Sequence, residues 1–223
     1  MTLGAACRLQ AGATVLDLAC GKAEMLAQWA HNYRITGIGV DISTVFLDAG
    51  RARITEMGLG ERVHLVEQDA ATYTSDMQFD VVSCIGATWI GNGLVGTLRL
   101  MQKQVESDGI LVVGEPFWNE PPTDDVLKAL KVGADDFVSL EATFDRIADA
   151  GFEVVEMVAA DLDSWDRYEA SQWRTLDDWL RTHGHEHPLA AEVKQMKEHG
   201  REAYIRYGRR YLGWAVFVLR VVH

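Results

Sequence analysis

The chain has 223 residues, 48% of them apolar and 24% charged, which is the ordinary composition of a soluble globular protein. Its formal net charge of −12 argues against a non-specific nucleic-acid binder, and three cysteines without CxxC spacing argue against a disulfide framework or a structural zinc site. Because the sequence shows no signal peptide and no apolar run of about 18 residues, we predict a cytoplasmic protein with a small-molecule partner and no nucleic-acid or membrane partner.

The first part of the chain alternates short apolar runs with helical patterns. Residues 14–19 are predicted to form a strand that ends in a carboxylate and a turn of small residues. The segments after it are a helix, a strand, a helix and two strands, over residues 22–33, 35–40, 44–57, 62–70 and 79–85. Strands that alternate with helices in this way favour parallel pairing.

The second part continues the alternation with two interruptions. A helix, a strand after an Asp108-Gly109 turn, a helix and two strands are predicted over residues 94–104, 109–115, 141–150, 152–158 and 214–222. Residues 115–140 form a long connection that contains prolines, and residues 159–212 are mostly helical in pattern. The whole pattern predicts an open α/β sheet with helices on both faces.

The loop after the first strand is the first candidate site, because ligands of open α/β sheets bind at the carboxyl ends of strands. Small residues at Ala19, Gly21 and Ala23 let the backbone approach a ligand. The pattern differs from the G-x-G-x-x-G of dinucleotide-binding loops. Asp17 would repel a diphosphate but suits a ligand that carries an ammonium or sulfonium.

Two more acids follow strand ends. Asp41 closes the second strand, where an acid accepts hydrogen bonds from ribose hydroxyls. Asp69 closes the third strand, next to the small Ala70, and could accept from the exocyclic amine of adenine. Together with Asp17 these acids describe a site for S-adenosylmethionine (SAM). The alternative is that they are helix caps and turn formers, which is a common use of aspartate.

Four motifs resemble those of class I SAM-dependent methyltransferases. VLDLACGKA is similar to the family's first motif, GVDIS to its ribose motif, EQDAA to its adenine motif and FDVVSCIGA to its fourth, over about residues 12–115. More narrowly, CIGATWI, GEPFW and WDRYEASQW resemble a small bacterial subgroup of uncharacterised methyltransferases. The resemblance implies a Rossmann-like, seven-stranded, mostly parallel sheet that ends in an antiparallel strand pair.

The resemblance also implies the cofactor and its contacts. SAM would be the cofactor and S-adenosyl-L-homocysteine (SAH) its product. The cofactor-binding residues implied are Asp17, Ala19, Gly21, Asp41, Ile42, Asp69, Ala70 and Ile85. Alanine stands at positions 19 and 23, where the family commonly has glycine. Because alanine is comfortable only at negative φ, we expect a first loop that is slightly less open than in the family.

Aromatic residues mark a candidate acceptor site. Trp89 and Trp118 follow the fourth and fifth strands, and Trp165 and Tyr168 lie in the inserted segment. Aromatic rings can pack a planar acceptor or hold a cation over their faces. The alternative for each ring is core packing, which is the more common use of tryptophan on helices. We predict these four residues as substrate contacts.

Glu115 is the main candidate for a general base, because it ends the fifth strand and faces the ligand end of the sheet. The alternative is an acid that orders the loop. Tyr168 is a weaker catalytic candidate. No metal is predicted, since the histidines of HGHEHP (183–188) lack supporting ligands and are interpreted as an exposed loop.

We therefore predict a SAM-binding core over residues 1–158, a helical cap over 159–212 that covers the acceptor, and a final core strand over 213–223. The predicted function is methyl transfer to a heteroatom of a small molecule. The alternatives are a SAM-consuming cyclase or lyase on the same fold, and a non-enzymatic SAM-binding regulator. A homo-oligomer is possible. Only 13 residues precede Thr14, so the cap, a partner chain or an upstream segment would have to cover the cofactor.

Overall fold

The computed structural model describes residues 3–184 and 186–222. The chain divides into two compact units. The core unit comprises Met1–Glu115, Thr143–Val158 and Ala215–His223, and the second unit comprises Pro116–Ala142 and Ala159–Trp214. Residues 116–142, which the sequence places in the core, do not group with it. The structure groups these residues with the insertion, and within this second unit the backbone N–H of Asn119 donates to the carbonyl of Tyr211 at 2.8 Å.

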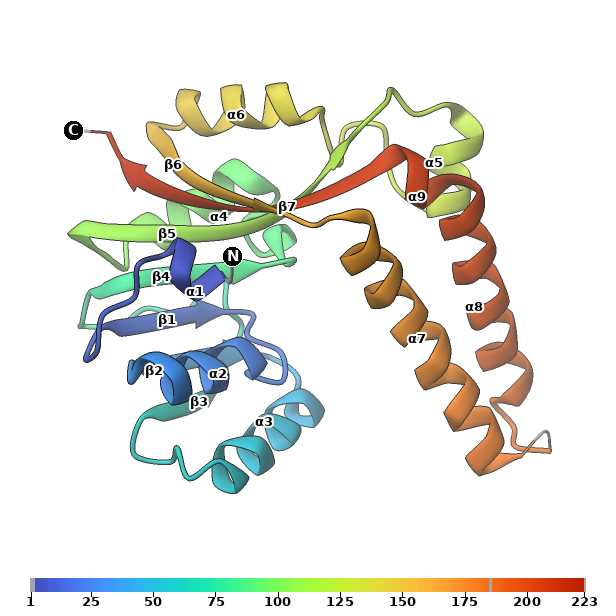
Figure 1. Cartoon of the computed structure of the whole chain (residues 1–223), viewed down its shortest axis with the longest axis horizontal. Coiled ribbons are helices and arrows are strands. Elements are labelled where there is room, and N and C mark those ends of the chain that lie inside the picture. Colours follow the sequence, from blue (N-terminus) through green and yellow to red (C-terminus); the bar gives the residue numbers. More distant parts are fainter. Residues whose placement is uncertain (1–2, 185, 223) are drawn as a thin grey trace. The chain divides into compact units, whose positions relative to one another are not determined.

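The core unit is built on a seven-stranded sheet with the order β3-β2-β1-β4-β5-β7-β6 (Figure 1). Its strands are β1 (Thr14–Leu18), β2 (Thr36–Asp41), β3 (Val63–Glu67), β4 (Phe79–Ile85), β5 (Val105–Trp118), β6 (Phe152–Ala159) and β7 (Leu212–Val221). Strands β1 to β5 pair in parallel, whereas β7 points opposite to β1 (Figure 1). The predicted mostly parallel sheet is confirmed. The strand order reverses between β1 and β4, which is where such sheets bind ligands.

The central strands are buried because helices cover the sheet. Val15 and Leu16 in β1 and Val112 in β5 have no exposed surface. The helices of this unit are α1 (Leu3–Ala6), α2 (Glu24–Tyr33), α3 (Thr44–Glu56), α4 (Leu94–Gln102) and α6 (Leu140–Asp149), although α6 begins in residues of the second unit. Strands covered on both faces appear in the sequence as continuous apolar runs. The predicted bounds of β1, β2 and β4 therefore agree with the observed bounds to within one residue.

Strand β5 begins earlier than predicted. Phe79 pairs with Val105 and Val81 pairs with Ile110, so the strand is already formed before the expected Asp108-Gly109 turn, and extra residues bulge out of its register. A Cβ on Gly109 would lie 2.9 Å from the carbonyl oxygen of Asp80. The Asp-Gly pair is therefore a bulge inside a strand and not a turn before it, because only glycine allows this close approach of two strands.

The second unit is mainly helical. It contains α5 (Asp124–Leu130), α7 (Leu162–His183), α8 (Ala190–Ala203), a π-helical turn (Tyr204–Gly208) and α9 (Arg209–Tyr211). Helix α5 was not predicted, because its seven residues lie in a connection interpreted as loop. Within the described ranges, no helix combines the length and the apolar character that a membrane span requires.

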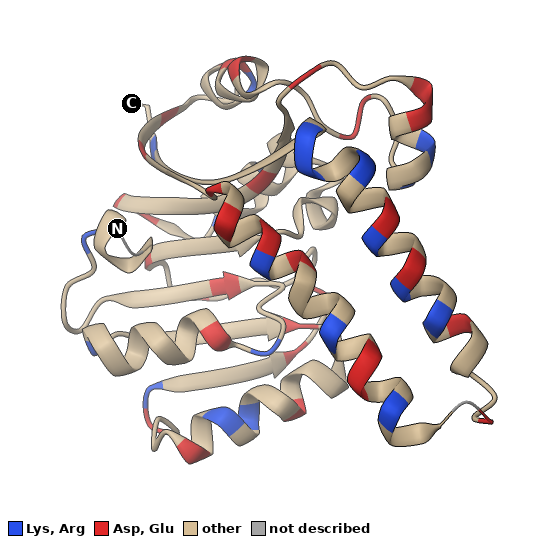
Figure 2. Cartoon of the chain, turned by 45° about the vertical axis from the view of Figure 1, so that its right-hand side comes forward, with Lys and Arg blue, Asp and Glu red and all other residues tan. Residues whose placement is uncertain are grey.

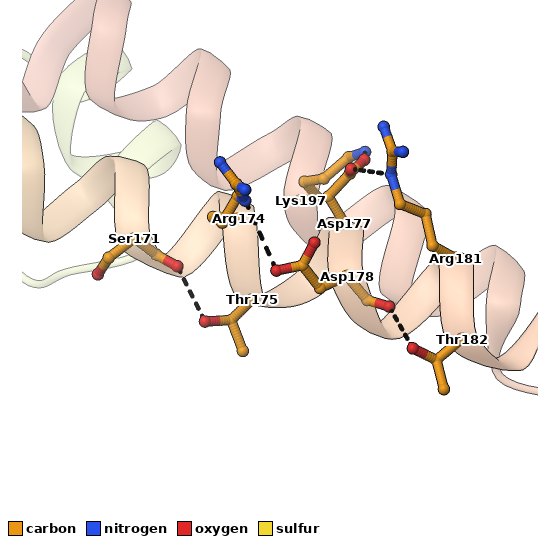
Figure 3. Close-up of polar contacts among 8 residues, drawn as sticks. All are labelled: Ser171, Arg174, Thr175, Asp177, Asp178, Arg181, Thr182 and Lys197. Atoms are coloured by element: carbon orange, nitrogen blue, oxygen red, sulfur yellow. Dashed lines mark hydrogen bonds and ion pairs between the residues drawn. The ribbon is translucent and has the colours of Figure 1, made fainter.

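Helices α7 and α8 pack against each other and carry charges of both signs along their length (Figure 2). Asp177 on α7 accepts hydrogen bonds of 2.8 Å from Arg181 on the same helix and from Lys197 on α8 (Figure 3). Arg174 and Asp178 form a longer pair of 3.6 Å within α7 (Figure 3). The pairs of Asp177 with Arg181 and of Asp178 with Arg174 lie within α7, and exposed pairs of this kind add little stability. The Asp177–Lys197 pair is the contact in this group that joins the two helices.

Candidate active site

The loop after β1 is fastened to the end of β2. The backbone N–H of Gly21 donates to Oδ2 of Asp41 at 2.8 Å, and the backbone N–H of Ser43 donates to Oδ1 at 2.8 Å. The N–H of Cys20 donates to the carbonyl of Val40 at 3.0 Å. Asp41 is only 8% exposed. Its carboxylate thus holds the first loop in place and retains further lone pairs for a ligand.

Three alternate residues of this loop have left-handed backbone: Ala19 at φ 57°, Gly21 at φ 56° and Ala23 at φ 51°. The expectation of a less open loop assumed negative φ for the alanines, and that assumption is wrong. Left-handed backbone costs an L-residue about 1–2 kcal/mol, so the loop holds two strained residues. A Cβ on Gly21 would meet no atom within 4 Å, so the space beside this glycine is open.

Asp17 lies in β1 and is 4% exposed. Ser83, its register partner in β4, donates a hydrogen bond of 2.7 Å to Oδ1 of Asp17. Burial raises the pKa of the Asp17 carboxyl to about 7, while the hydrogen bond from Ser83 lowers it and the charge of Asp41 raises it further. One hydrogen bond offsets only part of the cost of burying the Asp17 charge, so a cationic ligand group beside Asp17 would stabilise its ionised form.

The other residues predicted for the cofactor also lie at strand ends. Asp69 follows β3, is exposed and accepts a 2.9 Å hydrogen bond from the N–H of Ala71, so it acts as a turn former. Ala70 is buried, and Ile85 ends β4 half-buried. Ile42 is 71% exposed directly after Asp41. Ligand contacts of these four residues stay predictions.

Glu115 is a buried carboxyl in β5, next to β4 in the sheet. It is 5% exposed and accepts a hydrogen bond of 2.7 Å at Oε2 from the hydroxyl of Thr88. Burial raises the pKa of Glu115 to about 7, against the lowering effects of the Thr88 hydrogen bond and the charge of Arg146. A carboxyl with this pKa changes protonation state near neutral pH, which is the property that a general base needs.

The predicted acceptor residues divide between the two units. Trp89 belongs to the core unit, lies in a 3-10 helix (Thr88–Gly91) and is 73% exposed. In the second unit, Trp118 is 6% exposed and packs edge-on against Phe137 at 5.9 Å, which matches the core-packing alternative. Its contact with an acceptor stays a prediction.

Trp165 and Tyr168 form part of an aromatic stack in the second unit. The ring of Trp165 lies 5.9 Å from Tyr168 and 6.0 Å from Trp214, with small interplanar angles. Tyr168 is 57% exposed, so one ring of the stack faces outward. The expectation that this segment covers the acceptor, and the weak catalytic candidacy of Tyr168, stay predictions.

Within the described part of the histidine-rich segment, Glu186 and Pro188 lie in an exposed loop as expected, whereas His183 belongs to α7. His183 is the last residue of α7, and its ring stacks on Trp179 at 4.3 Å. The ring of His187 packs edge-on against the same tryptophan at 4.8 Å, while His185 lies outside the described residues. In the parts of the chain that the structure describes, no three His, Cys, Asp or Glu side chains are grouped to hold a metal ion.

Comparison with known proteins identifies the family of this fold and site. A family model described as "Methyltransferase domain" matches residues 15–109. The uncharacterized protein YjhP of Escherichia coli K12 is 40% identical over 220 residues, which cover 98% of this chain and 88% of that protein. The chain belongs to the SAM-dependent methyltransferase family. Because two methyltransferases more than 40% identical to this chain were solved in complex with SAH, the chain is a methyltransferase whose cofactor is SAM, as the four motifs predicted.

Solved structures of methyltransferases agree with this assignment. A SAM-dependent methyltransferase from Geobacter sulfurreducens, solved in complex with SAH, is 41% identical, with a TM-score of 0.93 over 98% of this chain and 88% of that one. A methyltransferase from Thiobacillus denitrificans, also solved with SAH, is 43% identical, with a TM-score of 0.93 over 98% of this chain and 89% of that one.

Sequence reasoning about this methyltransferase missed two hydroxyl groups, those of Ser83 and Thr88. Ser83 carried a signal, since a polar residue inside the apolar run FDVVSCI asks for a buried partner. Its partner Asp17 lies 66 positions away. Thr88 lies within CIGATWI, the stretch that resembles a methyltransferase subgroup, but nothing local singles out its hydroxyl, because its partner Glu115 lies 27 positions away.

Proposed function

We propose that this methyltransferase transfers the methyl group of SAM to a heteroatom of a small molecule, with Glu115 as the general base. The proposal depends on one observation: Glu115 is a buried carboxyl, held by Thr88, in β5 beside the strand that ends at Ile85. In parallel sheets the carboxyl ends of neighbouring strands meet at one edge. The base is thereby near the strand ends that carry Asp17 and Asp41.

The residues present fit the cofactor. Asp17 is a buried carboxyl that accepts a hydrogen bond from the hydroxyl of Ser83, which suits the ammonium of the methionine part. Asp41 suits the ribose hydroxyls, and Ile42 offers 71% exposed apolar surface for the flat face of adenine. The open space beside Gly21 leaves room for the methionine part. When bound, SAM supplies an electrophilic methyl group on a sulfonium.

The residues of this chain have two tasks in the reaction. The first is alignment, since placing the acceptor atom in line with the methyl group accounts for most of the acceleration in a direct displacement. The second is removal of a proton. An acceptor N–H, O–H or S–H loses its proton as the new bond forms, and the carboxylate of Glu115 takes that proton. A pKa of about 7 lets Glu115 be ionised at neutral pH and still hold a proton after transfer.

Three further observations support the proposal. The Geobacter and Thiobacillus proteins were solved with SAH, the product of methyl donation, and each is more than 40% identical to this chain. Trp89 offers an exposed ring one residue after Thr88. The negative net charge of −12 suits a small neutral or cationic acceptor in the cytoplasm better than a nucleic acid.

The test is transfer of labelled methyl from SAM to small molecules of a cell extract, followed by mass spectrometry. We expect one labelled product and SAH from the wild-type protein. Glu115→Gln keeps the shape of the side chain but not the base, and should lower the rate by about a hundredfold or more at unchanged SAH affinity. Methylthioadenosine instead of SAH would indicate SAM cleavage. A Glu115→Gln protein with full activity would remove Glu115 from the mechanism.

A further inference from the structure

Glu115 is one end of a chain of buried hydrogen bonds. The hydroxyl of Thr88 donates to Oε2 of Glu115 at 2.7 Å. The carbonyl of Thr88 accepts from the hydroxyl of Thr97 at 2.6 Å, and Thr97 accepts in turn from the N–H of Gly91 at 3.1 Å. Thr88 is 9% exposed, and Thr97 on α4 is fully buried. Both ends of Thr88 are therefore fixed, its side chain by Glu115 and its backbone by α4.

The short helix that carries Thr88 has little freedom to move. A Cβ on Gly91 would overlap backbone atoms of Gly96 and Thr97, and a Cβ on Gly96 would overlap the carbonyl oxygen of Gly91. The two backbones thus touch at a place where only glycine fits. Because this contact and the Thr97 bond hold the segment, the hydroxyl of Thr88 keeps one position relative to β5.

We propose that Thr88 is a positioning residue that holds Glu115 in the ionised form required of a base, by donating to Oε2 and leaving Oε1 to take the acceptor's proton. This inference rests on the proposed function of Glu115. A threonine hydroxyl has one proton to donate. Donation to Glu115 stabilises the carboxylate over the carboxylic acid, because a hydrogen bond to the charged form favours that form.

Other groups that act on Glu115 oppose or assist Thr88. Burial disfavours the charged carboxylate, and the positive charge of Arg146 on α6 favours it. Cys84 on β4 is buried with its pKa raised to about 12, mainly by burial and then by the charges of Asp17 and Glu115, so it is a neutral thiol at physiological pH. Among the described groups, Thr88 is thus the hydrogen-bond donor that counteracts the burial of Glu115.

The experiment is a direct titration of Glu115, which needs no knowledge of the acceptor. The protein is labelled with ¹³C at the glutamate side-chain carboxyl, and Glu115→Gln assigns its signal. Thr88→Val removes the donor at nearly constant shape, and Thr88→Ser retains it. We expect the Glu115 midpoint to rise by about one pH unit or more in Thr88→Val, and to stay within about 0.3 units of wild type in Thr88→Ser. SAH affinity should stay unchanged in both variants.

An unchanged Glu115 midpoint in folded Thr88→Val would overturn the inference, even if that variant were less stable. If the valine protein does not fold, Thr88→Cys replaces it, since a thiol is a weak donor of similar size, and its midpoint must lie above that of Thr88→Ser. The two proposals fail separately. Full activity of Glu115→Gln would contradict the base, whereas an unshifted titration would contradict the coupling to Thr88.

Discussion

Two aspartates with equal numbers of hydrogen bonds show how the two units differ. Asp41 in the core unit accepts two hydrogen bonds of 2.8 Å from backbone N–H groups and is 8% exposed. Asp177 in the second unit accepts two of the same length from the side chains of Arg181 and Lys197, and its side chain is 37% exposed. The donor–acceptor distances are equal, but the hydrogen bonds of the two aspartates contribute differently to stability.

Asp41 accepts its hydrogen bonds from backbone N–H groups, so no flexible donor side chain loses rotamer freedom when these bonds form. Arginine and lysine side chains lose rotamer freedom when they pair, and water screens their charges at the surface. The core unit therefore contains groups whose removal disturbs a defined geometry. The ion pairs of the second unit described here are exposed and contribute little to stability.

Asp41→Ala is expected to have the largest effect. The change removes the acceptor of the backbone N–H groups of Gly21 in the first loop and of Ser43 after β2, together with the proposed ribose contact. Loss of such charge-assisted hydrogen bonds costs about 1.5–3 kcal/mol of ligand binding. SAH affinity should fall by about ten- to a hundredfold, as measured by calorimetric titration. Asp48→Ala, on the exposed side of α3, is the matched control and should bind SAH normally. An unchanged dissociation constant in folded Asp41→Ala would remove Asp41 from the site.

The next largest expected effect is a decrease in the free energy of unfolding as the pH rises. Burial raises the pKa of Asp17 and Glu115 to about 7 in the folded protein, against about 4 in the unfolded chain. The folded state then binds more protons than the unfolded state between these values. This contribution to stability is complete below about pH 4 and is lost as the pH rises through about 7.

Between about pH 6 and pH 8, the free energy of unfolding should fall by about 1 kcal/mol for each of the two carboxyls. Urea unfolding of the ligand-free protein at several pH values measures this slope. Asp17→Asn and Glu115→Gln should each flatten it. A wild-type protein that becomes more stable over this pH range would contradict the burial of both carboxyls.

The strained loop gives a smaller effect of opposite sign. Ala19→Gly relieves left-handed strain of about 1–2 kcal/mol but gives the unfolded chain more freedom, which costs about 0.4–1 kcal/mol. We expect a net gain in stability of about 0–1.6 kcal/mol, with SAH affinity retained. Ala52→Gly is the control, because this exposed helical alanine of α3 should lose about 1 kcal/mol on the same change. Destabilisation of equal size in both variants would contradict the loop geometry.

Asp177→Asn is expected to have the smallest effect. The hydrogen bonds from Lys197 and then Arg181 hold the pKa of Asp177 at about 2. Its stabilising effect is present above the unfolded pKa near 4 and is lost as the pH falls through about 2. A small decrease in melting temperature at neutral pH should shrink further in high salt. Asp178→Asn is the control and should change nothing, since its pair with Arg174 lies within one helix. If the decrease in melting temperature is the same in high salt, Asp177 stabilises the protein through a contact other than charge pairing.

Much of the core unit could be predicted from the sequence, because its signals are local. Buried parallel strands read as apolar runs, and the acids Asp17 and Asp41 stand where those runs end. The first motif was found because its small residues lie within one short loop. Family membership followed from these local patterns alone, and the comparisons confirmed it.

Pairings across the sheet could not be predicted in this way. The Asp108-Gly109 pair looks like a turn in the sequence, and only its closeness to Asp80 in β4 makes it a bulge. The left-handed backbone of Ala19 depends on the bonds that tie the loop to β2. Likewise, residues 116–142 belong to the second unit, in which the backbone N–H of Asn119 donates to the carbonyl of Tyr211, about ninety positions along the chain.

The sequence by itself determined the fold class, the alternation of strands and helices in the core unit, and the positions of Asp17 and Asp41 near strand ends, since each depends on neighbours within a few residues. The tertiary structure alone decided how those acids behave. Ser83 is 66 positions from Asp17, and Thr88 is 27 from Glu115, so no local pattern reveals either bond. Burial and a distant hydroxyl together set the pKa of a carboxyl, and both arise only when the strands pair.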